Sequence, residues 1–208
     1  KLQVELSVLA DTSVGAMLTR RGYILLGFEN ELGLRLDESS LARLSGNAGS
    51  ADRSIAVAPA TPEETRTWID VVLTGFEHPD TVEGLTPHES FPRDAGERFF
   101  DAFMSELPGF QRYLARREGV VAGGASLRLF AGVAQLCGAA TLPAHRRRGV
   151  QSALLHARLH DAARAGCDIA VVTTPPGSKS QENAQRQGFA LLYSRAILVR
   201  EPSGTGTP

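Results

Sequence analysis

The spacing of apolar residues changes along the first 45 residues and predicts three elements there. Residues 4–8 alternate weakly between apolar and polar, as a half-buried strand does. Residues 14–21 have the spacing of a short helix, with Asp11, Thr12 and Ser13 as candidates to cap its start and Gly22 placed to end it. A strand is expected again at residues 23–28. The chain therefore begins with a strand, a helix and a strand.

The remaining pattern alternates between strand and helix spacing and predicts a larger domain. After a strand at 54–58 we expect a helix opened by Pro62, Glu63 and Glu64, with Trp68, Ile69, Val72 and Phe76 at core-facing spacing. A loop or broken helix is expected at 78–97 and a helix at 98–107. The elements expected after these are strands at 110–116, 120–130 and 132–141, a helix at 149–165, an apolar strand at 169–172, a helix at 180–187 and a strand at 189–199. Strands first and alternating elements later predict an α/β fold, with a mixed, mostly antiparallel sheet flanked by helices.

Composition divides the chain between residues 45 and 54, where small, polar and glycine-rich residues are typical of a linker. We expect a strand-helix-strand segment at 1–45, a linker at 46–53, the main domain at 54–201 and a disordered tail at 202–208. Residues 4–34 also align without a gap on residues 170–200. The first segment is then either the tail of a degenerate earlier repeat or a chance likeness, and it either completes the sheet or belongs to a partner domain. Because a strand begins so close to Lys1, we expect further residues before it.

Composition and charge exclude several classes of protein. No apolar run approaches the roughly 18 residues of a membrane span, so we expect a soluble protein without a membrane partner. A formal net charge of -1 gives no broad basic field for nucleic acid. Cys137 and Cys167 have no neighbours at metal-ligand spacing, and no metal is expected. They are expected to be buried thiols in a cytoplasmic protein.

One turn, at residues 142–153, has the features of an anion-binding site. Pro143 is followed by three arginines, then by Gly149 and the first turn of a helix. The first N–H groups of a helix have no internal partners, and the helix dipole is positive there. The arginines add mobile positive charge that suits phosphate groups. A pyrophosphate fits this turn, and the alternative is an exposed turn that binds nothing.

Residues 146–151 resemble the Q/R-x-x-G-x-G/A signature of the GCN5-related N-acetyltransferase (GNAT) superfamily, with Gln151 where that family usually has Gly or Ala. The resemblance covers residues 55–200 and implies a GNAT-like (acyl-CoA N-acyltransferase) fold with acetyl-CoA as acyl donor. It also implies that residues 139–141 pair with the pantetheine arm and that residues 150–153 donate N–H groups to the pyrophosphate. The implied cofactor-binding residues are Ala139, Ala140, Thr141, Arg146, Arg147, Arg148, Gly149, Val150, Gln151, Ser152, Ala153 and Asn183. Asn183, or Ser180, either contacts the cofactor or caps its own helix.

The resemblance implies less about catalysis. Many family members have a tyrosine acid four residues before a Gly-Phe pair, but this sequence has Ala184 there. Tyr193 is a substitute candidate, with a structural role in the sheet as the alternative. Glu89 is a second candidate, from a loop whose charged groups either attract a cationic amine or are simply solvated: Glu77, His78, Asp80, Glu83, His88 and Glu89. Residues 134–140 hold no carboxylate base, so proximity would supply most of the rate.

These features favour an N-acetyltransferase that moves an acetyl group from acetyl-CoA to an amine by direct attack. The acceptor is a small molecule or a protein, and a homodimer is compatible with the sequence. The alternative is a catalytically degenerate acyl-CoA-binding sensor or interaction module, which Ala184 and Gln151 favour. Nucleic-acid binding through the arginines is disfavoured, because one short basic run stands in a nearly neutral chain.

Overall fold

The computed structural model describes residues 2–42, 54–78, 93–100 and 107–201. They belong to two compact units, Lys1–Gly33 with Thr173–Pro208, and Leu34–Val172. The linker at 46–53 and the tail at 202–208 lie outside the described residues, so the domain boundaries stay predictions. Within the described ranges, no helix is both long and apolar enough to cross a membrane.

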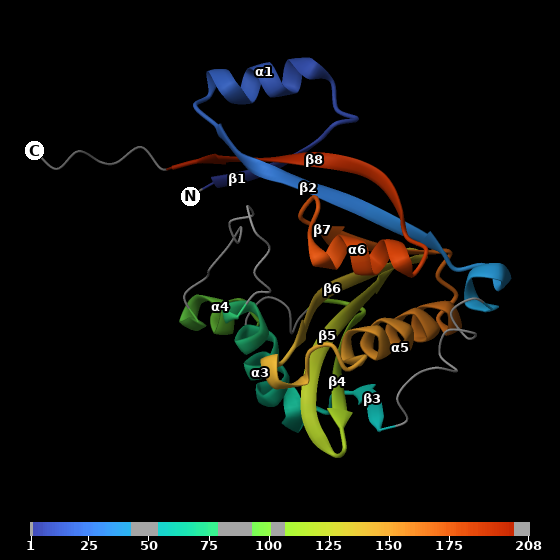
Figure 1. Ribbon diagram of the computed structural model, residues 1–208. Coiled ribbons are helices and arrows are strands. Elements are labelled where there is room, and N and C mark those ends of the chain that lie inside the picture. The colour runs from blue at the N-terminus through green and yellow to red at the C-terminus, as the bar shows by residue number, and fades with distance from the viewer. Residues whose placement is uncertain (1, 43–53, 79–92, 101–106, 202–208) are drawn as a thin grey trace, which may run out of the picture. The chain divides into compact units, whose positions relative to one another are not determined.

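The first unit is built around β8 (Ala190–Arg200), which has an antiparallel partner along each edge. On one edge β1 (Leu2–Ser7) pairs along its whole length. On the other edge β2 (Ile24–Arg35) pairs with β8 as far as Gly33, well beyond the predicted end at residue 28. The N-terminal segment therefore supplies both neighbours of the last strand (Figure 1).

The helices of this unit are α1 (Thr12–Arg20) and α6 (Lys179–Arg186). Asp11 caps α1 by accepting the Ser13 N–H at 2.8 Å. Hydrogen bonding to the Ser13 side chain, and then to its backbone, lowers the pKa of the Asp11 carboxyl. Ser178 caps α6 by accepting the Gln181 N–H at 3.2 Å. The cap is therefore neither of the two residues that the sequence suggested, because the helix begins one residue earlier than predicted and the preceding serine takes the capping position.

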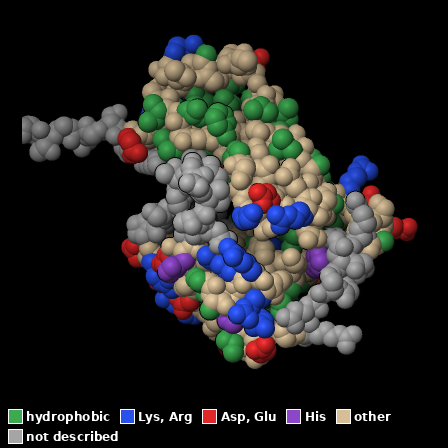
Figure 2. Space-filling view, in the orientation of Figure 1, with side chains coloured by type: hydrophobic (Ala, Val, Ile, Leu, Met, Phe, Trp, Pro, Cys, Tyr) green, Lys and Arg blue, Asp and Glu red, His purple; other side chains and the backbone are tan. Residues whose placement is uncertain are grey.

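Large apolar side chains are exposed on the first unit. Figure 2 shows hydrophobic side chains gathered in the upper part of the view. The exposed ones of this unit are Leu2, Val8, Leu9, Ile24, Leu25, Leu26, Phe28, Leu191 and Leu192. The unit on its own thus leaves part of its apolar surface uncovered.

The second unit contains a meander of four antiparallel strands followed by a parallel one. The strands are β3 (Ile55–Pro59), β4 (Phe110–Arg117), β5 (Val120–Phe130), β6 (Val133–Thr141) and β7 (Ile169–Thr174), which pair in the order β7-β6-β5-β4-β3. The helices are α3 (Thr65–Glu77), α4 (Arg93–Phe99) and α5 (Val150–Arg164), with 3-10 turns at Pro62–Glu64 and Pro143–His145. This confirms the predicted fold class, a mixed and mostly antiparallel α/β arrangement.

Glycines let α3 and α5 approach opposite faces of β5 and β6 (Figure 1). A Cβ at Gly124 would meet side chains of α3 at 3.2 Å, whereas a Cβ at Gly123 would meet α5 at 2.9 Å. Within α3, a Cβ at Gly75 would lie 2.3 Å from the Cβ of Ala140. The end of α3 therefore lies directly against the end of β6, just before the turn at residues 142–153.

The core of the second unit forms between α3 and the sheet. Trp68, Ile69 and Val72 are buried as predicted. Phe76 has the same spacing but is 44% exposed, so this core prediction is wrong. It lies in the last turn of α3, over Gly138, where the strand offers no side chain to cover the ring.

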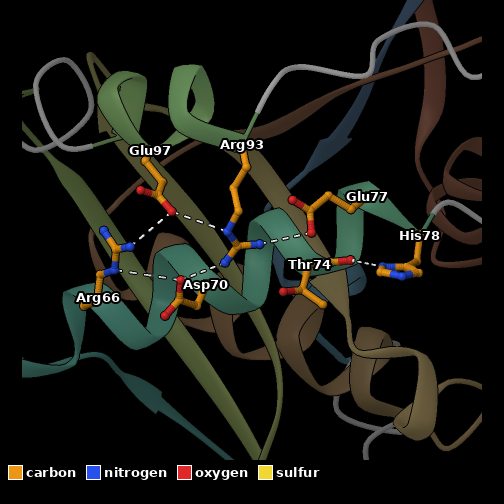
Figure 3. A network of polar contacts seen from close by, with 7 residues as sticks. All are labelled: Arg66, Asp70, Thr74, Glu77, His78, Arg93 and Glu97. Carbon is orange, nitrogen blue, oxygen red and sulfur yellow. Dashed lines mark hydrogen bonds and ion pairs between the residues drawn. The ribbon is translucent and has the colours of Figure 1, made fainter.

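A loop or a broken helix was predicted at 78–97, and the described residues 93–97 are helical, with α4 fixed to α3 by ion pairs. Arg93 contacts Asp70 at 2.8 Å and Glu77 at 3.0 Å, and both partners belong to α3 (Figure 3). Glu97 adds a contact to Arg66 at 3.1 Å. These contacts join residues more than 15 positions apart, so local periodicity does not reveal them.

Candidate functional site

The turn between β6 and α5 ends in a helix N-terminus without a side-chain cap. Gly149 is the N-cap residue and has a left-handed conformation, with φ 80°. The Ala153 N–H is used inside the helix, since it donates to the Gly149 carbonyl at 3.0 Å. Val150, Gln151 and Ser152 precede it, and their N–H groups have no acceptor within α5. These three N–H groups and the positive end of the helix dipole are suited to bind an anion.

Packing fixes the position of this helix end. Val150 is 1% exposed and lies over Gly123 of β5, where its Cγ1 is 2.9 Å from the position that a Cβ would take. Leu154, one turn later, is fully buried against the same glycine. The N–H groups at the start of α5 are therefore held on the sheet rather than on a loop.

The three arginines of the turn have different environments. Arg146 donates from Nε to the Thr141 carbonyl at 3.4 Å and from Nη2 to the His78 carbonyl. It thus ties the turn to the end of β6 and to the residue that ends α3. Arg147 and Arg148 are exposed, and no ion pair holds them within the described residues. Their charges can move toward a bound phosphate.

One edge of β6 is open in the second unit just before the turn. The parallel pairs between β6 and β7 run from Val133↔Ile169 to Leu136↔Val172. β6 then continues to Thr141 with β5 as its strand partner. Beyond Leu136, backbone groups of Ala139 and Ala140 on the β7 side have no strand partner within the described part of this unit. Such an edge can receive an extended chain that carries amides.

Two cysteines lie near these elements, and burial raises the pKa of both thiols. Cys167 is buried as predicted, whereas Cys137 is only half-buried because it lies where β6 leaves β7. A raised pKa keeps the Cys137 thiol protonated at neutral pH, which disfavours it as a nucleophile.

Of the charged and imidazole groups predicted to gather after the first helix of the main domain, the structure describes only Glu77 and His78. Both make hydrogen bonds within the fold. Glu77 accepts a hydrogen bond from Arg93 at 3.0 Å, and the His78 Nδ1 donates to the Thr74 carbonyl at 2.9 Å (Figure 3). Glu89 lies outside the described residues, as do Asp80, Glu83 and His88. The catalytic role of Glu89 therefore stays a prediction.

Asn183 and Tyr193 belong to the first unit. The Asn183 Oδ1 accepts a hydrogen bond from Arg186 at 3.1 Å, within α6. Tyr193 is half-buried on β8 and lies opposite Glu31 of β2 in the register of the two strands. Ala184 is buried. The roles predicted for Asn183 and Tyr193 stay predictions.

Sequence reasoning missed a polar network around Glu31, which is 8% exposed. Its carboxylate accepts from the Thr173 hydroxyl at 2.6 Å and pairs with Arg195 at 3.0 Å. Arg195 also pairs with Glu5 and Glu29. The available signal was the polar run at residues 29–31, two glutamates flanking an asparagine, inside a largely apolar strand. Among the described residues, no group of three His, Cys, Asp or Glu side chains is placed to hold a metal.

Comparison with known proteins identifies the family. The sequence model described as "Acetyltransferase (GNAT) family" matches residues 77–189, more than half of the chain. No curated protein matches. Similar solved structures include a GCN5-related N-acetyltransferase from Kribbella flavida (20% identity, TM-score 0.64, covering 95% of this chain and 67% of that one). A tandem GNAT protein from the clavulanic acid biosynthesis pathway, solved without acetyl-CoA, has 15% identity and a TM-score of 0.65, covering 97% of this chain and 64% of that one.

A third similar structure is a GNAT family acetyltransferase from Brucella melitensis in complex with acetyl-CoA (18% identity, TM-score 0.52, covering 73% of this chain and 91% of that one). At these identities the likeness shows the fold. The chain spans about two thirds of the length of the Kribbella and tandem proteins. The family match and the shared fold agree with the resemblance seen at residues 146–151. The chain belongs to the GNAT family of acetyltransferases.

Proposed function

We propose that this protein transfers an acetyl group from acetyl-CoA to an amine of its acceptor by direct attack. The observation that carries the proposal is the uncapped N-terminus of α5 at the end of the open β6 edge. The N–H groups of Val150, Gln151 and Ser152 would receive the pyrophosphate. The backbone of Ala139 and Ala140 would pair with the pantetheine arm.

The residues present fit this ligand. Thr141 stands between the edge and the turn, and its hydroxyl is buried without a hydrogen-bond partner among the described residues. A buried polar group without a partner is costly, and an amide of the pantetheine arm would satisfy it. Arg147 and Arg148 are exposed beside the helix end and would lie near the phosphates. Groups that could bind the pantetheine amides and groups that could bind the phosphates therefore follow each other along one stretch of chain.

Bound acetyl-CoA supplies a thioester whose carbonyl carbon the neutral amine attacks, so that a C–N bond forms, the C–S bond breaks and CoA leaves as the thiol. The protein holds the donor by backbone groups and thereby provides proximity. Cys137 stays protonated, which favours direct attack over an acylated cysteine. Tyr193 is our candidate for the acid that protonates the leaving sulfur, and Glu89 for a group that binds the amine or takes its proton.

One observation favours the alternative of an acyl-CoA-binding sensor. Ala184 is a buried methyl group at the position where many family members have the tyrosine acid. Absence of that tyrosine would lower turnover but leave the acetyl-CoA site intact, since Ala184 is not among the residues proposed to hold the cofactor. Binding and turnover therefore have to be measured separately.

Release of free CoA thiol from acetyl-CoA distinguishes the two functions. Purified protein is incubated with acetyl-CoA and a panel of small-molecule and protein amines, and its melting temperature is measured with and without acetyl-CoA. We expect a higher melting temperature and amine-dependent thiol release. A stabilised protein that releases no thiol with any amine is a sensor. Y193F and E89Q should lower release and leave the stabilisation unchanged if these residues are catalytic.

A further inference from the structure

A buried arginine lies behind the open edge of β6. Arg158, in the middle of α5, is 2% exposed. Its Nε donates to the Leu154 carbonyl of its own helix at 3.0 Å. Its Nη1 donates to the Ser126 carbonyl of β5 at 3.0 Å and to the Cys137 carbonyl of β6 at 3.3 Å. One guanidinium thus joins α5 to two neighbouring strands.

This arginine has no counterion in the part of the chain that the structure describes. Burying a charge without a paired charge is unfavourable, and leucine or methionine would fill the same space without that cost. Burial lowers the pKa of Arg158 to about 10, so the group still carries its proton at neutral pH. The guanidinium is therefore present for its hydrogen bonds rather than for an ion pair.

Its two strand carbonyls flank an irregularity in the sheet. Ala125 pairs with Ala139 and Ser126 pairs with Cys137, which leaves Gly138 as an extra residue, with φ 22°. Such a bulge interrupts the ladder and leaves backbone groups that need other partners. Arg158 supplies donors to carbonyls on both strands at this point.

The bulge lies where β6 becomes open. The last pair with β7 is Leu136↔Val172, and the bulge follows at Gly138. Ala139 and Ala140 come next, and they are the residues that would pair with the pantetheine arm. A change in the bulge would alter the direction of this edge.

We propose that Arg158 is a positioning residue of the acetyl-donor site, which fixes the bulge at Gly138 so that the backbone of Ala139 and Ala140 is held to receive the pantetheine arm. This inference rests on the proposed function. Arg158 acts through the strand and does not touch the donor. Its loss should therefore affect binding of the pantetheine portion and leave binding of the phosphates at the start of α5 unchanged.

The test compares two ligands and three variants. Acetyl-CoA uses both the edge and the turn, whereas adenosine 3′,5′-bisphosphate has phosphates but no pantetheine. R158M removes the donors at similar volume, and R158K keeps the charge with a smaller donor group. R164M is the matched control, because Arg164 is an exposed residue of the same helix. Calorimetry gives the affinities, and hydrogen exchange of the ligand-free proteins gives the protection of residues 137–141.

We expect R158M to bind acetyl-CoA about tenfold more weakly, the equivalent of one or two lost hydrogen bonds. Its affinity for the bisphosphate should stay within about twofold of the wild type. Exchange at residues 137–141 should become faster, R158K should recover part of both effects, and R164M should match the wild type.

Equal losses for both ligands, or an unchanged affinity for acetyl-CoA, would overturn the proposal. Unchanged exchange at residues 137–141 would also overturn it. If R158M does not fold, the same comparison is made with R158K, for which a smaller loss confined to acetyl-CoA is expected. If the wild type binds neither ligand, the proposed function is wrong, while exchange in R158M still decides whether Arg158 fixes the bulge.

Discussion

Replacing Gly149 by alanine tests the proposed pyrophosphate site at residues 142–153 most directly. With φ 80°, this residue has a left-handed conformation that costs an L-residue about 1–2 kcal/mol. The new Cβ would lie 3.6 Å from Ile55 Cδ1, an ordinary contact, so overlap adds nothing to the strain. We expect the free energy of unfolding to fall by about 1–2 kcal/mol, and the melting temperature of a protein of this size by about 2–8 °C.

The same methyl group should weaken CoA binding, because in the proposed site the backbone of Gly149 would have to approach the pyrophosphate closely. A loss of at least about tenfold, or 1.4 kcal/mol, is expected in calorimetry well below the melting temperature. Gly166→Ala is the matched control. Gly166 follows the other end of α5 with φ 76°, and a Cβ there would meet nothing within 4 Å. Both variants should lose similar stability, but only Gly149→Ala should lose affinity.

The reasoning fails if the two variants bind CoA equally well. Equal binding would mean that the phosphates do not approach the N-cap of α5, and the pyrophosphate would have to lie elsewhere. Unequal stability losses would instead show that the strain at Gly149 is relieved locally, which leaves the binding comparison valid.

Three further predictions concern packing, titration and capping. Gly75→Ala should cost about 1–3 kcal/mol in urea unfolding, because its Cβ would overlap that of Ala140, and adding Ala140→Gly should recover part of the loss. Burial and then a hydrogen bond to Asp161 raise the pKa of the Tyr113 phenol. The folded state therefore keeps this proton where the unfolded state loses it, so stability should be complete below about pH 10 and fall above it, and less so in Y113F. Ser178→Ala should cost about 0.5–2 kcal/mol by removing the cap of α6, and an unchanged urea midpoint would contradict that role.

Features that depend on local sequence could be predicted. The turn at residues 142–153 combines a proline, a glycine and a helix start, and each acts within a few residues of itself. The strands before it alternate in the usual way, and short turns join them. The fold class and the family followed from these signals, and the structure and the family match confirm both.

Features that depend on distant partners could not be predicted. β2 is longer than its own apolar pattern because β8 continues to pair with it. Phe76 follows the helical period but is exposed, since the strand below it has Gly138 at that point. In the sequence Arg158 looks like an ordinary charged residue of a surface helix. Its buried hydrogen-bond partners, the carbonyls of Ser126 and Cys137, are found only at the bulge between β5 and β6. In each case the deciding contact joins residues far apart in the sequence.

The two departures from the family pattern affect different steps. The backbone N–H of Gln151 is present at the start of α5 whatever the side chain is. The change from Gly or Ala therefore does not remove this hydrogen-bond donor from the proposed anion site. Ala184 replaces a side chain that acts on the leaving sulfur, and no backbone group can take over the proton that a tyrosine would give. If the proposed function is right, we therefore expect acetyl-CoA binding to be robust, and we expect the rate of transfer to depend on whether Tyr193 or solvent supplies that proton.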